Sequence, residues 1–133
     1  MRPIRRLVLG ASVAVLTASG CATPAPAQTT AAPSVDGREI YSRDCLACHM
    51  SDGRGVPGMN PALVGSPWVA GPADALAGFV MTGGYGPDVL MARFDYLSDA
   101  ELAALLTYIR AEFAGIAEPV IAAQVARMRS QLQ

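Results

Sequence analysis

The sequence predicts an all-α domain with three or four core helices, long loops and an extra C-terminal helix. Apolar side chains recur three and four residues apart, which is the spacing of one helix face, in four stretches. These stretches are 34–48, 72–82, 98–113 and the segment from Pro119 onward. Nine Gly or Pro residues in positions 50–72 exclude a regular helix or strand there and predict a long loop.

The first 20 residues have the pattern of an export signal and are not expected to belong to the domain. Three arginines precede an apolar stretch, Leu7 to Leu16, that is too short to cross a bilayer as a helix. Residues 1–20 are therefore predicted to be a signal peptide, and the chain is predicted to be exported to the periplasm.

Two cleavage sites compete after this leader. Ala18-Ser19-Gly20-Cys21 resembles a bacterial lipobox, which would leave Cys21 as a lipidated first residue at a membrane surface. Ala25-Pro26-Ala27 is an A-x-A site for ordinary signal peptidase and would give a start at Gln28. We favour the lipoprotein, because a lone cysteine directly after Ala-Ser-Gly is otherwise unexplained.

Composition divides the remaining chain into a tether, a domain and a tail. Residues 21–33 are rich in Pro, Ala and Thr, and are predicted to form a tether that reaches about 35–40 Å when stretched. The alternative is a disordered remnant without a role. Residues 34–115 form the predicted domain, and residues 116–133 an amphipathic helix that we expect to pack back on it. From Cys21 onward the chain has seven Arg, no Lys and eleven Asp or Glu, which argues against a nucleic-acid-binding surface.

The first helix, residues 34–48, is predicted to begin with Ser34 as its N-cap. One stripe of this helix contains Gly37, Tyr41, Cys45 and Cys48. Glycine inside a helix costs roughly 1 kcal/mol relative to alanine, so we expect Gly37 to lie where another element approaches closely.

The stretch Cys45-Leu46-Ala47-Cys48-His49 has the C-x-x-C-H pattern of haem c attachment. The two thiols lie one helical turn apart, about 5 Å, so both can add to the vinyl groups of one porphyrin. His49 then offers an imidazole nitrogen to the iron. A zinc site is disfavoured, because His49 is the only histidine and no second cysteine pair exists. A thioredoxin-like pair lacks its βαβ setting, and a structural disulfide would leave His49 without a role.

The loop of residues 50–72 is expected to wrap a bound cofactor. A metal-binding histidine needs an acceptor for its other ring N–H, and the carbonyl of Pro61 is our candidate. Trp68 has two interpretations of equal weight: it covers a haem edge or donates to a propionate, or it is a half-buried aromatic that anchors the loop.

Six methionines compete to be a second ligand of the iron. Met91 lies in the loop between the helices at 72–82 and 98–113, on the segment that must close over the other haem face. Met81 lies in an apolar helical run and is most simply a core residue. Met59 lies in the proximal loop beside Pro61. We therefore predict Met91 as the ligand, with Met59 and Met81 as alternatives.

Residues 34–113 resemble a class I c-type cytochrome in their motifs and in the order of these motifs. The motifs are Cys45-x-x-Cys48-His49, Asn60-Pro61-x-Leu63-x-Gly65, Met91-Ala92-x-Phe94 and a Leu-Ser-Asp-x-Glu helix start at Leu97. The chain departs from the family at Ala92, where the family usually has proline after the methionine.

The resemblance implies an all-α fold around one covalently bound haem c. It implies that the first and last core helices cross, with Gly37 near the Leu105–Tyr108 region. It also implies His49 and Met91 as the two axial ligands, and the Pro61 carbonyl as the acceptor for His49.

Iron with both axial positions filled has no open site, so the sequence predicts an electron carrier and not an enzyme. The expected donor is a periplasmic redox protein such as a dehydrogenase, and the expected acceptor one such as a terminal oxidase. The alternative is a haem enzyme or gas-ligand sensor with a labile sixth ligand, for which the polar candidates are Tyr85, Arg93 and Tyr96. Relatives of this kind also occur as electron-accepting subunits of dehydrogenases, so a free shuttle and a subunit both stay open.

Overall fold

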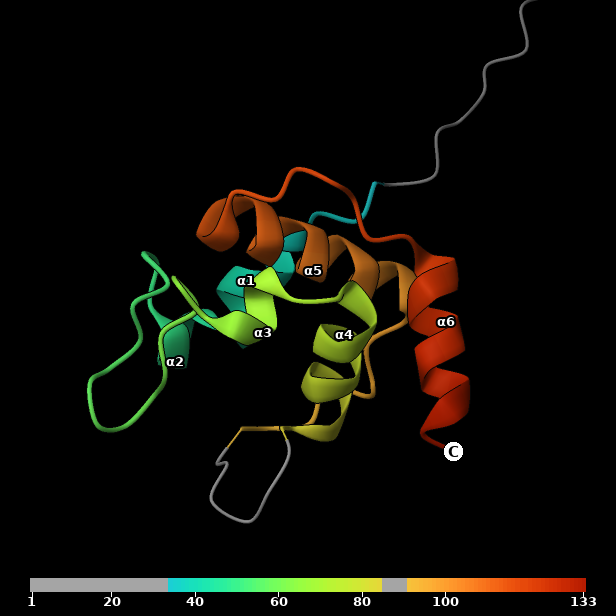
Figure 1. The fold of residues 1–133 in the computed structure, drawn as a ribbon, viewed down its shortest axis with the longest axis horizontal. Helices are drawn as coiled ribbons and strands as arrows, with labels where there is room; N and C mark the ends of the chain where they lie inside the picture. The colour runs from blue at the N-terminus through green and yellow to red at the C-terminus, as the bar shows by residue number, and fades with distance from the viewer. Residues whose placement is uncertain (1–33, 85–90) are drawn as a thin grey trace, which may run out of the picture. The chain divides into compact units, whose positions relative to one another are not determined.

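The protein is described by a computed structural model that covers residues 34–84 and 91–133. The predicted leader 1–20, the tether 21–33 and Tyr85 lie outside the described residues. The helices are α1 (Gly37–Asp44), α2 (Leu46–His49), α3 (Pro67–Ala70), α4 (Ala73–Thr82), α5 (Asp99–Ala114) and α6 (Ala122–Gln131) (Figure 1). The described residues contain no strand, only an isolated bridge between Val56 and Asn60, which confirms the all-α prediction.

The predicted first helix is two helices separated at Cys45. Cys45 caps both, with φ −119° and ψ −31°, and its N–H donates to Tyr41 O. The predicted N-cap Ser34 is wrong: the Asp36 carboxylate accepts the N–H of Arg38 at 2.9 Å, so α1 begins at Gly37. An aspartate at this position satisfies an orphan N–H of the first turn, which leaves Ser34 outside the helix.

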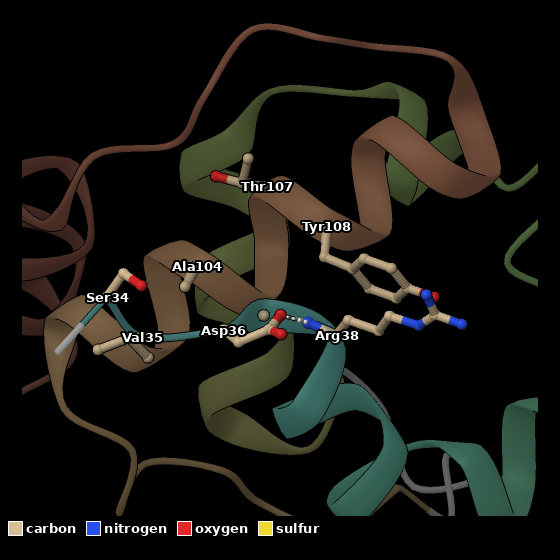
Figure 2. Close-up of a pocket in the computed structure, with 8 residues that line it drawn as sticks. Ser34, Val35, Asp36, Arg38, Ala104, Thr107 and Tyr108 are labelled. Carbon is tan, nitrogen blue, oxygen red and sulfur yellow. Dashed lines mark hydrogen bonds between the residues drawn. The ribbon is translucent and has the colours of Figure 1, made fainter.

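α1 packs against α5 at the distance of backbone contact. A Cβ on Gly37 would collide with the carbonyl of Ala104, so only glycine fits at this crossing. Figure 2 shows Ala104 and Tyr108 of α5 beside the Asp36–Arg38 end of α1. The crossing reaches the backbone nitrogen of Leu105, so it lies at the start of the Leu105–Tyr108 region that the resemblance implies.

α5 is the central helix and starts with the predicted capping box. The Ser98 hydroxyl accepts the N–H of Glu101, while the Glu101 carboxylate accepts the N–H of Ser98 at 2.9 Å. Three of its leucines are completely buried. The largest fully buried side chains of the described residues are Tyr41, Val69, Met81, Leu102, Leu105, Leu106 and Val125. These come from α1, α3, α4, α5 and α6, so all of these helices contribute to one core around α5.

α4 has almost the predicted bounds, but α3 lies in a segment that we predicted to be loop. Ser66 precedes α3 in an extended conformation, and Pro67 occupies its first turn, where a missing N–H costs nothing. Val69 in this single turn is buried and ties the loop to the core. The loop prediction is therefore wrong for Pro67–Ala70, because a single helical turn fits between Gly65 and Gly71 and tolerates a proline in its first turn.

α6 begins three residues later than predicted and packs beside both α5 and α4 (Figure 1). The preceding segment is held to α5 instead: the Thr107 hydroxyl accepts the N–H of Val120 at 2.9 Å. Val125 on the inner face is completely buried. None of the helices in the described ranges combines the length and the apolarity that crossing a bilayer requires.

Replacing Gly37 with alanine tests whether the close contact with Ala104 outweighs the low helix propensity of glycine. Helix propensity alone predicts that Gly37→Ala stabilises α1 by up to about 1 kcal/mol. The collision with Ala104 predicts the opposite sign, a loss of about 1–3 kcal/mol in the free energy of unfolding. Guanidinium unfolding measures whether the free energy of unfolding rises or falls. Ser42→Ala on the exposed face of α1 is the control. An increase in stability for Gly37→Ala would contradict the close crossing.

Candidate functional site

The two cysteines of the C-x-x-C-H motif lie in different surroundings. Cys45 is buried, Cys48 is exposed, and neither is in a disulfide. Burial raises the pKa of the Cys45 thiol to about 12, and the nearby Asp44 adds to the shift. The Cys45 thiol is therefore neutral at ordinary pH and points to the interior, while Cys48 faces outward. The motif thus spans the border between core and surface.

His49 is held by the residue that the sequence predicts. Its Nδ1 lies 3.0 Å from the carbonyl oxygen of Pro61. A carbonyl oxygen only accepts, so the proton of the neutral ring belongs on Nδ1. Nε2 is then the nitrogen with a free lone pair, and it is the atom of His49 that can bind a metal.

The loop that carries Pro61 is ordered by its own backbone. Gly55 N–H donates to the His49 carbonyl at 3.1 Å, and Val56 and Asn60 exchange two backbone hydrogen bonds at 2.9 and 2.8 Å. Gly55 has φ +63°, and a Cβ there would lie 2.7 Å from the Pro61 oxygen. Glycine at this position therefore leaves room for the carbonyl that holds His49. A cavity of about 500 Å³ beside this turn is lined by Arg54 and residues 57–62.

Tyr41 holds the end of α2, a role that the sequence analysis did not predict. Its hydroxyl donates to the carbonyl of Met50 at 2.6 Å, and its ring is 1% exposed. The ring packs 5.4 Å from that of Tyr108 and 5.3 Å from that of Phe113. Burial raises the pKa of Tyr41 to about 12, with smaller contributions in the same direction from neighbouring acidic groups. The signal available in the sequence was the place of Tyr41 one turn before Cys45 on the buried stripe.

Met91 is partly buried and packs against the core. Its carbonyl lies so close to α4 that a Cβ on Gly83 would approach it to 2.6 Å. Three residues later the N–H of Phe94 donates to the carbonyl of Val80 at 3.2 Å. The Met91 segment is thus fixed against the end of α4, with the methionine at the border of the core.

The competing methionines have other surroundings. Met81 is 2% exposed inside the core of α4, and Met59 is 78% exposed on the proximal loop. Met81 is thus a core residue of α4, while Met59 lies on an exposed part of the proximal loop.

Apolar side chains around the motif remain open to solvent. Leu46 is 37%, Val64 43% and Trp68 41% exposed, although each lies on a segment close in sequence to the motif or to Pro61. The Trp68 ring packs 4.6 Å from that of Phe79 and so links α3 to α4, a contact that is compatible with both interpretations of this residue. Two unbonded thiols, a histidine with Nε2 available and uncovered apolar side chains are the features that a covalently attached haem requires. The residues present therefore fit this group.

Other arrangements of ligands fit less well. Within residues 34–84 and 91–133, no three His, Cys, Asp or Glu side chains converge to hold a metal ion by themselves. A cavity of about 430 Å³ at the start of α1 contains none of the predicted site residues (Figure 2). Cys45, Cys48, His49, Pro61 and Met91 stay the predicted site residues: a hydrogen bond joins His49 to Pro61, while Met91 packs on a separate segment beside the end of α4.

Comparisons with known proteins agree with this assignment of the site to a haem. A family model described as cytochrome c oxidase, cbb3-type, subunit III matches residues 32–109. The cytochrome c subunit of the alcohol dehydrogenase (quinone) of Gluconobacter oxydans is 39% identical over 83 residues, which are 56% of this chain and 17% of that protein. The fructose dehydrogenase cytochrome subunit of Gluconobacter japonicus is 27% identical over 117 residues, 77% of this chain and 24% of that protein. The chain spans at most about a quarter of the length of these relatives.

The buried hydroxyl of Tyr41 makes stability depend on pH. Between about pH 10 and 12 the unfolded chain releases the Tyr41 proton while the folded protein keeps it, so the free energy of unfolding falls as pH rises through this window. At pH 7, Tyr41→Phe should cost about 1 kcal/mol, because the Met50 carbonyl loses its donor. Guanidinium unfolding should show that the difference in free energy of unfolding between wild type and Tyr41→Phe is smaller at pH 11 than at pH 7. An equal gap at both pH values would contradict the role of this hydroxyl.

Proposed function

The chain belongs to the c-type cytochrome family, whose family model matches residues 32–109, and we propose that it carries single electrons between redox proteins. The electrons would pass through a haem c held by Cys45, Cys48, His49 and Met91. Members of the family are electron-transfer proteins with a covalently bound haem, and are not themselves catalysts. Haem c, when bound, supplies an iron that gains and loses one electron. The chain's own residues determine how the group is attached, oriented and closed to other ligands.

The contact between His49 Nδ1 and the Pro61 carbonyl carries the proposal. It orients the ring and leaves Nε2 for the iron. Cys45 and Cys48 form the two thioether attachments, one from the buried and one from the exposed side of the motif. Met91, held against α4, would be the second residue that binds the iron. A thioether from Met91 together with the imidazole of His49 would favour the ferrous state and raise the reduction potential, which suits an electron carrier.

The alternative of a haem enzyme or gas-ligand sensor has less support. It needs a polar side chain beside an open coordination position. Arg93 instead forms an ion pair with Asp95 at 2.8 Å, and Tyr96 is 64% exposed with its pKa raised by partial burial and the nearby Asp44. No observation on the described residues favours this second function.

The relatives indicate the class of partner. Both are cytochrome subunits of dehydrogenases, one acting on alcohol and one on fructose by their names. We infer that this chain accepts electrons from a dehydrogenase in the periplasm and passes them to an acceptor such as a terminal oxidase. The acidic balance of the chain after Cys21, seven Arg against eleven Asp or Glu, favours partners with a basic or apolar docking face.

We propose that the protein is anchored at a membrane surface by a lipid on Cys21. The support is the lipobox-like Ala18-Ser19-Gly20-Cys21 and the tether of residues 21–33, which would give the domain about 35–40 Å of reach. A lipid anchor would keep the carrier near membrane-bound partners and raise its effective concentration there.

The ligand assignment is tested by three matched methionine replacements. Met91→Leu, Met81→Leu and Met59→Leu each remove the sulfur and conserve volume, so folding is preserved. Only Met91→Leu should abolish the methionine–iron charge-transfer band of the ferric protein and allow rapid CO binding to the ferrous protein. If Met91→Leu keeps the band and Met81→Leu or Met59→Leu loses it, the role passes to that methionine. A wild-type protein without the band and with rapid CO binding would overturn the electron-carrier proposal.

Mass spectrometry of the mature protein tests the anchor. We expect one haem and a lipid on Cys21, and we expect Cys21→Ala to move the protein from the membrane to the soluble fraction without changing its visible spectrum. A mature chain that begins at Gln28 would instead show cleavage by ordinary signal peptidase.

A further inference from the structure

Arg129 of α6 binds the segment that follows Met91. Its Nε donates to the Asp99 carboxylate at 2.8 Å, and its two terminal nitrogens donate to the main-chain carbonyls of Asp95 and Leu97 at 2.8 and 2.7 Å. The side chains of Arg129 and Asp99 are 25% and 34% exposed, so this ion pair is partly shielded from water. One planar guanidinium thus fixes three points across five residues.

The segment that Arg129 holds, residues 95–99, is continuous with the Met91 segment. The N–H of Leu97 donates to the carbonyl of Phe94 at 3.3 Å, and the N–H of Phe94 donates to the carbonyl of Val80 in α4 at 3.2 Å. Phe94 itself is buried, at 8% exposed. Two residues separate Phe94 from Met91, so a short stretch of chain joins the Asp95–Leu97 turn to the methionine.

α6 is well placed to act on this segment, because it contacts the helices before and after it. It packs on α4, which precedes Met91, and on α5, which follows it (Figure 1). Its own position is fixed by the fully buried Val125 and by the hydrogen bond between Val120 and Thr107. The residues matched by the family model end at 109, so α6 lies outside that match.

We propose that Arg129 is a positioning residue that determines how firmly Met91 is held at the iron. The inference rests on the proposed role of Met91 as axial ligand. With these three hydrogen bonds in place, which we call the Arg129 clamp, the Met91 sulfur would be held close to a bound haem iron, so an external ligand would compete less well for that position. Without the clamp, the Asp95–Leu97 turn loses two hydrogen bonds and α5 loses the one at Asp99, so a state with Met91 away from the iron would become more populated.

The test compares Arg129→Met with Arg127→Met in the full, haem-loaded chain. Arg129→Met keeps the apolar stem but removes every donor, while Arg127 is an exposed arginine on the same helix and its replacement makes the same change in charge. Arg129→Met should accelerate CO binding to the ferrous protein about tenfold or more, because charge-assisted hydrogen bonds are lost. It should also make the ferric charge-transfer band fade on heating well below the temperature at which helical circular dichroism is lost. Arg127→Met should change neither.

Two further variants make the result decisive. Arg129→Lys keeps the charge but cannot reach three acceptors, so it should give an intermediate CO rate; it also serves if Arg129→Met does not fold. Adding Arg129→Met to Met91→Leu should accelerate CO binding no further, since the position is already open. If the CO rate is unchanged and the band and the helices melt together in Arg129→Met and Arg129→Lys, Arg129 is only structural and the inference is wrong. Failure of the Met91 assignment would appear separately, as an unchanged spectrum in Met91→Leu alone.

Discussion

The crossing of α1 and α5 is the contact on which the remaining structure depends. Gly37 lets the backbone of α1 touch the carbonyl of Ala104, and the buried Tyr41 then meets Tyr108 and Phe113 one turn later. The direction of α1 determines where Cys45 enters the core and where α2 leaves it. Phe113 also leaves room only for a hydrogen at Gly53, so α5 fixes the start of the loop that supports His49. A bulkier residue at either glycine would therefore disturb the site from a distance.

The sequence predicted well the features that arise from local or periodic signals. The helices near 72–82 and 98–113, the capping box at Ser98 and the pairing of His49 with the Pro61 carbonyl lie where we expected them. The break at Cys45 was missed, because the apolar stripe continues through it and only the hydrogen bonds of the chain end the first helix. The N-cap was misplaced because Ser34 and Asp36 are both good capping residues and propensity does not rank two neighbours.

Other features depend on contacts that no pattern records. The order of the loop after His49 comes from backbone bonds between Val56 and Asn60 and around Gly53, and backbone bonding leaves little trace in side-chain type. The Tyr41 hydroxyl finds its acceptor nine residues away, and Arg129 finds its carboxylate thirty residues away. Such pairs become visible only when the fold brings the elements together. The ligand roles of Cys45, Cys48, His49 and Met91 stay predictions of the sequence that the geometry accommodates.

The clamp made by Arg129 has a consequence for how this chain can change. Two of its three acceptors are main-chain oxygens, which every amino acid carries, and only the one at Asp99 depends on a particular side chain. Substitutions at Asp95 and Tyr96, which are both exposed, therefore leave those two bonds intact. The side chains of the turn beside the methionine segment can therefore change to suit new partners, while the hydrogen bonds from Arg129 to its main chain stay the same.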